Sequence, residues 1–235
     1  AATDVPTTAV RNATTSKSKR SRRNFLDLFI FICYNQVQMI KDFWNNIFSQ
    51  DKDYVKISPN FLDEILNHIN LKENSKILDV GSGTGDLVIK LAKKGFQSTG
   101  LDISDVALSK AKNKALEEKV ENLTNFIEFD ADISDYKNIP NSPFDLITCK
   151  LVFPFIKNRI LFLKNIKNIL ARDGYFILIT PVLYPKIEYS EHLKKISVDK
   201  EETLNLLNQI FNKVEIFKET PIKENGTEII FIASL

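Results

Sequence analysis

The stretch I-L-D-V-G-S-G-T-G-D, at residues 77–86, decides how the rest of this chain is read. A short apolar run enters a turn with glycine at positions 81, 83 and 85, and an amphipathic helical pattern leaves it. Glycine adopts backbone angles closed to other residues and lets a ligand approach the main chain. A helix that begins after such a turn points free N–H groups at the carboxyl end of the strand, where open α/β sheets bind ligands. The stretch therefore predicts a strand, a ligand-binding turn and a helix.

Apolar runs and helical patterns alternate on both sides of this stretch, which predicts parallel βαβ units. The last two apolar runs are joined by a short link that contains Pro and Gly, so they should pair antiparallel. The predicted strands are residues 76–80, 97–101, 126–129, 144–149, 175–180, 213–217 and 228–233. The predicted helices are residues 39–50, 58–70, 84–94, 104–119, 159–171 and 200–211. The fold class is therefore α/β.

Residues 1–38 differ in composition from the rest of the chain. They are rich in Thr, Ser, Lys and Arg and hold few large apolar side chains before residue 25, so we predict a disordered basic tail. Its composition is also typical of an organellar transit segment or a weak signal segment, and an arbitrary extension is the plainer interpretation. The only methionine, Met39, stands where the regular pattern starts, and we predict one domain at residues 39–235.

The composition is that of a globular protein. Apolar residues make up 43% of the chain and charged residues 26%, and the net charge is +2. Most of the excess positive charge lies in residues 1–38, so the body offers no electrostatic footprint for nucleic acid. The two cysteines have no zinc-binding spacing, and no apolar run approaches the ~20 residues of a spanning helix. We therefore expect a cytoplasmic protein without a metal, a nucleic-acid partner or a transmembrane segment, with organellar import if the tail is a transit segment. The oligomeric state is not determined.

Carboxylates near the turn limit the kind of ligand. Asp102 ends the next strand, 21 residues after Gly81, the interval at which an acid typically meets ribose hydroxyls. A nicotinamide dinucleotide site would need glycine at position 86, where this chain has Asp86. Asp79 adds a second negative charge, which would repel a pyrophosphate and suit a cation. No Gly-Lys-Ser/Thr follows the turn, so a Walker phosphate loop is excluded.

Five segments together resemble the class I methyltransferases that use S-adenosylmethionine (SAM), especially the branch that methylates quinone-type small molecules. They are I-L-D-V-G-S-G-T-G-D at 77–86, T-G-L-D-I-S at 99–104, F-I-E-F-D-A-D at 126–132, P-F-D-L-I-T at 143–148 and D-G-Y-F-I-L-I-T-P at 173–181. The resemblance implies a Rossmann-like, seven-stranded, mostly parallel sheet with helices on both faces and a C-terminal reversed β-hairpin. It implies SAM as the cofactor.

The resemblance also assigns roles to residues. It places Asp79 and the glycine turn near the methionyl end of SAM, Asp102 on the ribose, and either Asp130 or Asp132 on the adenine amine. The implied cofactor-binding residues are Asp79, Gly81, Ser82, Gly83, Gly85, Asp102, Ile103, Asp130, Ala131 and Asp132. The chain departs from the family at residues 172–174, where Arg-Asp-Gly replaces the usual Pro-Gly-Gly turn. Residues 149–155 lack the motifs of enzymes that methylate DNA bases, so base methylation is disfavoured.

Methyl transfer from SAM needs alignment first, and a general base only for acceptors that must lose a proton. His192, in the segment after the fifth predicted strand, is a weak candidate for that base, and a surface histidine is the plainer interpretation. His68 is expected at a helix end on the surface. Cys149 is expected to be a small buried residue, and no catalytic residue is otherwise identified.

Several further side chains have two possible roles. Lys150 is expected to be a solvated lysine, with contact to an acidic acceptor as the alternative. Phe153 and Phe155 either line an apolar acceptor site or belong to the core. Phe43 and Trp44 lie on a helix that either closes over SAM, as in small methyltransferases, or simply packs on the sheet.

The sequence thus predicts a SAM-dependent methyltransferase. Because it has no large insertion between its predicted elements, we expect a small-molecule acceptor that is methylated on O, N or C. Three alternatives remain: an aminopropyltransferase that uses decarboxylated SAM, a catalytically silent SAM-fold protein that acts in binding or regulation, and a nicotinamide dehydrogenase. The last is disfavoured by Asp79 and Asp86.

Overall fold

The structure, a computed structural model, describes residues 37–50, 58–184, 187–222 and 226–235. The chain divides into two compact units, residues 1–43 and 44–235. Residues 37–43 of the first unit are helical, and so are residues 44–49 of the second. The predicted disordered tail therefore lies outside the described residues up to residue 36. Its last two residues, 37 and 38, are helical, and the predicted domain boundary at residue 39 stays a prediction.

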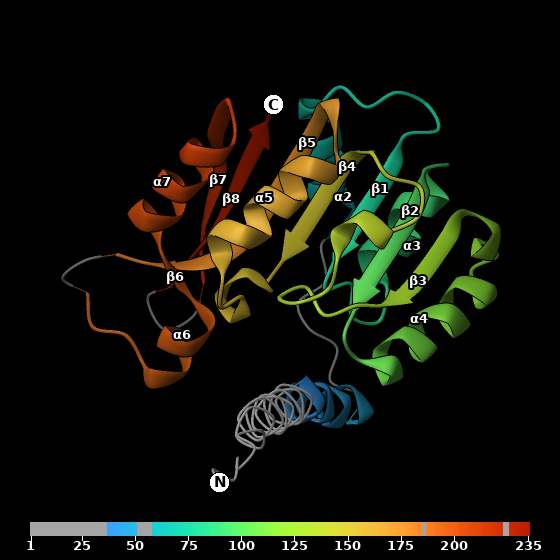
Figure 1. The fold of residues 1–235 in the computed structure, drawn as a ribbon, viewed down its shortest axis with the longest axis horizontal. Helices are drawn as coiled ribbons and strands as arrows, with labels where there is room; N and C mark the ends of the chain where they lie inside the picture. The colour runs from blue at the N-terminus through green and yellow to red at the C-terminus, as the bar shows by residue number, and fades with distance from the viewer. Residues whose placement is uncertain (1–36, 51–57, 185–186, 223–225) are drawn as a thin grey trace, which may run out of the picture. The chain divides into compact units, whose positions relative to one another are not determined.

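The second unit is built on one mixed sheet with the strand order β3-β2-β1-β4-β5-β8-β7 (Figure 1). Neighbouring strands from β3 to β5 are parallel, and β8 runs antiparallel to both β5 and β7. The strands are β1 Lys76–Val80, β2 Gln97–Asp102, β3 Thr124–Glu128, β4 Phe144–Lys150, β5 Leu170–Leu183, β6 Val198–Asp199, β7 Lys213–Pro221 and β8 Thr227–Ser234. The seven predicted strands and the reversed C-terminal hairpin are confirmed, and β6, which pairs with the end of β5, is an addition.

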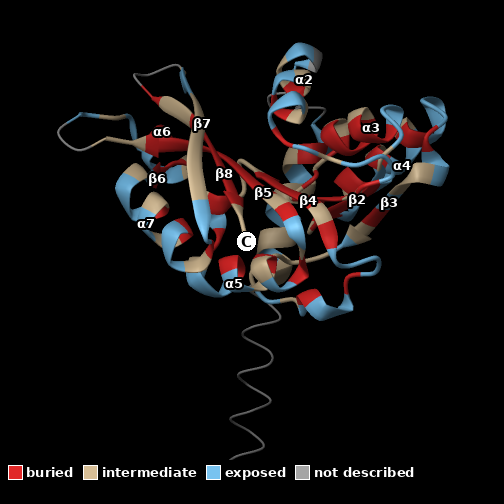
Figure 2. Ribbon diagram, turned by 90° about the horizontal axis from the view of Figure 1, so that it is seen from above, coloured by how far each residue is buried: buried red, intermediate tan, exposed pale blue. Residues whose placement is uncertain are grey.

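Helices cover both faces of this sheet (Figure 2). The helices α2 Pro59–His68, α3 Asp86–Lys93 and α4 Asp105–Glu117 lie on one face, and α5 Arg159–Ile169 and α7 Lys200–Ile210 lie on the other. A short helix, α6 Glu191–Ile196, and three 3₁₀ turns, η1 Glu121–Leu123, η2 Tyr136–Asn138 and η3 Phe153–Phe155, complete the unit. Separate apolar clusters fill the two layers, one between α2, α3 and the sheet and the other beneath α5 and α7.

Local sequence explains where the helices begin. The Ser58 side chain accepts a hydrogen bond from the Phe61 N–H, and Pro59 occupies the first helical position, where no N–H is needed. Leu62, Ile65 and Ile69 then recur on one side of α2 and are buried. This apolar stripe docks α2 on the sheet, as its spacing predicts.

The predictions are wrong in detail around β5. The predicted turn at residues 172–174 lies inside the strand: Phe144 pairs with Leu170 and Leu146 with Tyr175, so residues 171–174 bulge opposite the single residue Asp145. The carboxylate of Asp145 accepts the Lys76 N–H at 2.8 Å, which ties the bulge to the start of β1. Helix α6 and strand β6 lie in a segment that the sequence analysis left without regular structure.

Among the described residues, no helix is long and apolar enough to cross a membrane.

Candidate functional site

The glycine loop joins β1 to α3 at the carboxyl edge of the parallel strands (Figure 1). The N–H groups of Gly81 and Ser82 both donate to the Leu101 carbonyl at the end of β2, at 2.7 and 2.8 Å. Gly85 has a φ of 79°, and a Cβ added there would lie 2.9 Å from the Ala111 Cβ on α4. That left-handed residue explains why α3 begins at Asp86, two residues later than predicted. The loop is thus hydrogen-bonded to the end of β2 and packs closely against α4.

Asp102 is held at this edge by backbone hydrogen bonds, and only 8% of its surface is exposed. Its Oδ2 accepts the Gly83 N–H at 2.8 Å, and its Oδ1 accepts the Ser104 N–H at 2.9 Å. Burial raises the pKa of this carboxyl, and the backbone N–H groups that it accepts oppose that rise. A carboxylate has about four lone-pair sites, and the backbone N–H groups of Gly83, Ser104 and Ile103 do not fill them all. This acceptor therefore suits the hydroxyls of a ribose.

Asp79 lies on β1, the strand beside β2, where it pairs with Gly100, and it is more deeply buried than Asp102. It is buried in β1, where the Thr148 hydroxyl of β4 donates to its Oδ1 at 2.7 Å. Burial raises the pKa of the carboxyl to about 7, while the Thr148 hydrogen bond and the nearby Lys150 lower it. A half-ionised buried carboxylate gains from a cationic partner. This fits a ligand that carries an ammonium or a sulfonium.

Ser82 supplies a polar atom in the loop itself. Its Oγ is buried and has no hydrogen-bond partner among the described residues. A Cβ added at Gly100 of β2 would lie 2.6 Å from this oxygen, so only glycine at position 100 leaves room for the serine. The two residues thus fit each other, and the hydroxyl remains a group that a bound molecule can satisfy.

The two acids after β3 have different partners. Asp132 Oδ1 accepts the N–H groups of Lys157 and Asn158, both at 3.2 Å, and so holds the turn before α5. Asp130 Oδ1 accepts only the local N–H of Asp132, at 2.9 Å. Between them, the Ala131 carbonyl accepts the Tyr136 hydroxyl at 2.8 Å. Residues 130–132 follow β3, the strand beside β2. Ile103 comes directly after β2 and is partly buried. The predicted cofactor residues therefore lie at or just after the carboxyl ends of three neighbouring strands, β1, β2 and β3.

Residues 44–49 pack on the same edge. The Ser104 hydroxyl donates to the Asn45 Oδ1 at 2.6 Å, and the Lys110 ammonium donates to the Phe48 carbonyl at 2.7 Å. The Phe48 ring would lie 3.3 Å from a Cβ on Gly83. This helical segment therefore covers the glycine loop, and the sequence analysis identified neither Asn45 nor Phe48 because an amphipathic pattern does not reveal which partner it covers.

Aromatic side chains extend this cover toward β4. The Trp44 and Phe155 rings meet edge to face with centroids 5.3 Å apart, and Phe155 is 43% exposed. Phe153, two residues before it, is fully buried in the core. Of the two phenylalanines considered for an acceptor site, only Phe155 therefore presents a surface. Phe43 is exposed and belongs to the first unit.

The candidate catalytic side chains are not gathered at the loop. His192 is exposed on α6, which packs beside η3. The His68 Nε2 lies 2.7 Å from Glu215 Oε1 on the surface between α2 and β7, as expected of a helix-end histidine. Cys149 is buried, and burial raises the pKa of its thiol, so it stays protonated.

Lys150 corrects a prediction. It ends β4, and its pKa is lowered, chiefly by burial, so it is not the solvated lysine that the sequence analysis favoured. Among the charged groups that raise its pKa are Glu228 at the start of β8 and Asp79. Burial in turn raises the pKa of Glu228. The predicted position of Lys150 at the carboxyl end of a strand is correct, but hydropathy alone does not show how much of a lysine's aliphatic side chain is buried.

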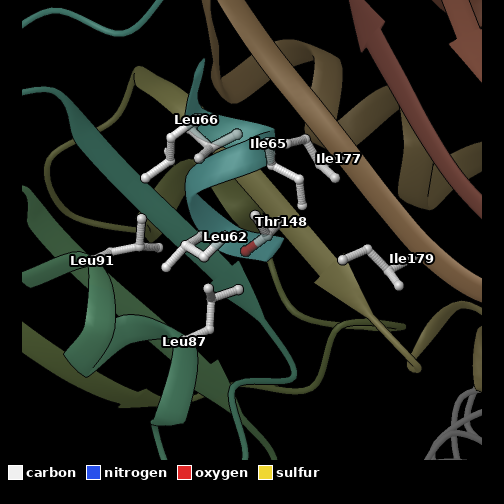
Figure 3. Close-up of a pocket in the computed structure, with 9 residues that line it drawn as sticks. Leu62, Ile65, Leu66, Leu87, Leu91, Thr148, Ile177 and Ile179 are labelled. Atoms are coloured by element: carbon white, nitrogen blue, oxygen red, sulfur yellow. The ribbon is translucent and has the colours of Figure 1, made fainter. Parts of the chain in front are cut away.

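Two hollows lie away from the glycine loop. One, of about 10 Å³, is apolar and lies between α2, α3 and the sheet, with Thr148 among the residues that line it (Figure 3). The other, of about 300 Å³, lies beside α7 and is lined by Leu183, Tyr184, Asp199, Lys200, Glu201, Leu204 and Ile216. The first has room for about one water molecule, so neither its size nor its lining suits a cofactor. The candidate site therefore rests on the loop and its carboxylates.

Comparisons with known proteins agree with this geometry. The chain is 34% identical over 118 residues to a putative methyltransferase, YqeM, of Bacillus subtilis (strain 168), which covers 40% of this chain and 48% of that protein. It is 29% identical over 161 residues to the carboxy-S-adenosyl-L-methionine synthase of Nautilia profundicola, which covers 66% of this chain and 63% of that protein. The matched part of the chain thus spans less than two thirds of the length of either relative.

A solved structure shows the same fold. Phospholethanolamine N-methyltransferase 2 of Haemonchus contortus, in complex with phosphomonomethylethanolamine and S-adenosylhomocysteine, superposes with a TM-score of 0.65. The sequences are 15% identical, and the match covers 78% of this chain and 54% of that one.

The model of the methyltransferase domain family matches residues 71–228, which is more than half of the chain and includes the glycine loop, Asp102 and the reversed hairpin up to β8. The chain therefore belongs to the methyltransferase domain family, the class I enzymes that use S-adenosyl-L-methionine.

Proposed function

We propose that this protein binds SAM across the carboxyl edges of β1, β2 and β3 and transfers its methyl group to a small-molecule acceptor. One observation carries the proposal: the buried Asp102 carboxylate accepts N–H groups from the glycine loop and from the start of α4, and so is held in place at the end of β2. A group arranged in this way before any ligand binds loses little entropy when it accepts two hydroxyls.

Each binding residue then has a chemical role. Asp102 accepts the ribose hydroxyls, and Asp79 accepts the ammonium of the methionyl group. For the adenine amine we propose Asp130, because Asp132 already accepts two backbone N–H groups. Ile103 and Ala131 lie beside these acids and supply surface for the adenine. The turn at Gly81, Gly83 and Gly85, with Ser82, lets the ligand approach the main chain.

When bound, SAM supplies an electrophilic methyl group together with its leaving group. The protein contributes the alignment of the reactants and the exclusion of water from the site. The cover formed by Asn45, Phe48 and Trp44 excludes water from the loop, and the exposed Phe155 offers the acceptor an apolar surface. A nitrogen acceptor that is already nucleophilic needs no more than this alignment. For an oxygen or carbon acceptor we propose His192, on α6 beside η3, as the base that takes the proton.

Two points support a small-molecule acceptor. Beside η3 the described surface includes the exposed ring of Phe155, which meets Trp44 edge to face. The Haemonchus contortus enzyme that shares the fold was solved with a small acceptor, phosphomonomethylethanolamine. Neither aminopropyl transfer nor a catalytically silent role is favoured by any observation on the site.

Calorimetric titration of the full chain with SAM, S-adenosylhomocysteine and NAD tests the proposal. We expect micromolar dissociation constants for the first two ligands and no binding of NAD. Asp102→Asn should weaken S-adenosylhomocysteine at least tenfold, whereas Asp173→Asn, on the exposed bulge of β5, should not. Thermal melts of each variant separate weak binding from misfolding. If the folded wild-type protein does not bind S-adenosylhomocysteine, the proposal is wrong.

A further inference from the structure

A polar group lies on the α2–α3 face of the sheet, at its carboxyl edge. Asp79 of β1 pairs with Thr148 of β4, and Val80 pairs with Cys149. Because side chains alternate along a strand, Lys150 is the next residue on the face that holds Asp79 and Thr148. Such diagonal neighbours on adjacent strands lie roughly 7–8 Å apart at their backbones, within reach of a long side chain. The structure thus places an ammonium and a carboxylate side by side at the strand ends.

The surroundings of Lys150 hold it there. Lys150 pairs with Ile179 of β5, and Ile179 pairs with Ile230 of β8, two residues from Glu228 on the same face. Glu228, Asp79 and Asp86 favour the charged lysine, and Lys90 opposes it while itself pairing with Asp86 at 2.7 Å. A buried ammonium is stable only beside partner charges, because leaving water costs several kcal/mol. Lys150 therefore lies between acids on β1 and β8.

We propose that Lys150 binds the α-carboxylate of the methionyl group of SAM, while Asp79 binds its α-ammonium. This inference rests on the proposed function and assigns to Lys150 a role that the sequence analysis did not identify. An amino-acid group carries both charges on one carbon, so it needs an acid and a base on the same side of the site. Asp79 and Lys150 meet that need on neighbouring strands.

Charge balance supports the same assignment. Before binding, Glu228 and the ionised form of Asp79 offset the charge of Lys150. When the ligand ammonium engages Asp79, the ligand carboxylate takes the place of Asp79 as a partner of Lys150. The zwitterion adds no net charge to the buried group, and each charge has a partner before and after binding. Glu228 continues to hold the lysine from the β8 side.

Ligand truncation combined with residue truncation tests this inference by calorimetry. S-adenosylhomocysteine carries both charged groups, decarboxylated SAM lacks the carboxylate, and 5′-methylthioadenosine lacks the amino-acid group entirely. We expect Lys150→Met to weaken S-adenosylhomocysteine at least tenfold and to leave the other two ligands within about twofold. Lys150→Arg should restore part of the affinity. Lys164→Met, on the exposed side of α5, is the control and should change none of the three.

Four results would overturn the inference. Equal losses for all three ligands would show that Lys150 only supports the fold of the site. Unchanged affinity for S-adenosylhomocysteine, with a raised KM for an acceptor, would assign the lysine to the acceptor instead. If wild-type protein binds 5′-methylthioadenosine but not S-adenosylhomocysteine, the amino-acid subsite is wrong while the nucleoside part of the proposed function stands. If it binds neither, both proposals fail.

Discussion

At the scale of single residues, ionising Asp79 is costly because its carboxyl lies in the interior of the sheet. Its carboxyl is buried, and its pKa is raised from 3.8 to about 7. A carboxyl whose folded-state pKa is raised stabilises the fold fully below its unfolded-state pKa and loses that contribution as the pH rises through the folded-state value. The ligand-free protein therefore loses stability as the pH rises from about 4 to about 7, and in return holds a carboxylate where a cation binds.

Asp79→Asn should remove this pH dependence. The amide keeps an oxygen that accepts the Thr148 hydroxyl but never ionises, so the variant should gain roughly 2–3 kcal/mol relative to wild type between pH 5 and pH 8. Urea unfolding at both pH values measures the difference. Asp102 carries one of the charges that raise the pKa of Asp79, so the measured difference reports Asp79 together with its repulsion from Asp102. Parallel pH profiles for wild type and Asp79→Asn would contradict the assignment, and Asp173→Asn serves as the exposed control.

Two glycines separate backbone strain from crowding. Gly85 and Gly95 both have positive φ, 79° and 92°, but a Cβ on Gly95 would meet nothing within 4 Å. We expect Gly95→Ala to cost about 1–2 kcal/mol from strain alone. Gly85→Ala should cost roughly 1–3 kcal/mol more, because its Cβ would press on Ala111 and Phe126. Urea unfolding compares the two variants, and equal costs would show that the packing of α4 against the loop adjusts freely.

At the scale of elements, α2 depends on one apolar stripe. Ile65 is buried among residues of α3, β4 and β5, next to the small apolar hollow. Ile65→Ala should destabilise the protein by about 2–5 kcal/mol, since the neighbouring side chains cannot close the space. Asn67→Ala, on the exposed side of the same helix, should stay within about 0.5 kcal/mol. Chemical denaturation of both variants tests whether α2 folds as part of the core or as a separate cover.

The elements that the sequence predicts well are those with a local cause. β1 at Lys76–Val80 has the predicted bounds, and α5 and α7 begin at the predicted Arg159 and Lys200, where an apolar period starts after a capping residue. Strand β6 has only two residues and exists because it pairs with β5, which no local pattern records. The bulge at residues 171–174 likewise depends on Asp145 across the strand.

The residues of the site also fall into two groups, those with a local sequence signal and those whose role depends on tertiary structure. The glycine loop and Asp102 follow from spacing along the chain, and the structure joins them through the Gly83 hydrogen bond. Asn45 and Phe48 come from a segment that is distant in the sequence. The charged partners of Lys150 lie on β1 and β8, so the roles of all three residues depend on tertiary structure. The roles of Asp130, Asp132 and His192 stay predictions, with the hydrogen bonds of Asp132 favouring Asp130 for the adenine amine.

At the scale of the whole molecule, binding, protonation and folding are linked through one carboxyl. If the ligand ammonium stabilises ionised Asp79, binding must lower the pKa of that carboxyl below about 7 and release a proton wherever the free protein holds one. Affinity for S-adenosylhomocysteine should therefore rise as the pH increases from 5.5 to 7.5, a range in which a ligand α-amino group, with a pKa near ~8, stays mostly protonated.

Calorimetry in buffers of different ionisation enthalpy measures that proton directly. Wild-type protein should release close to one proton per ligand near pH 6 and progressively fewer toward pH 7.5, because the free protein is then already partly ionised. Asp79→Asn should bind more weakly and release none, and 5′-methylthioadenosine, which has no ammonium, should release none from either protein. A proton released on binding 5′-methylthioadenosine would place the linkage in another group, such as Asp102, and would remove Asp79 from the amino-acid end of the cofactor site.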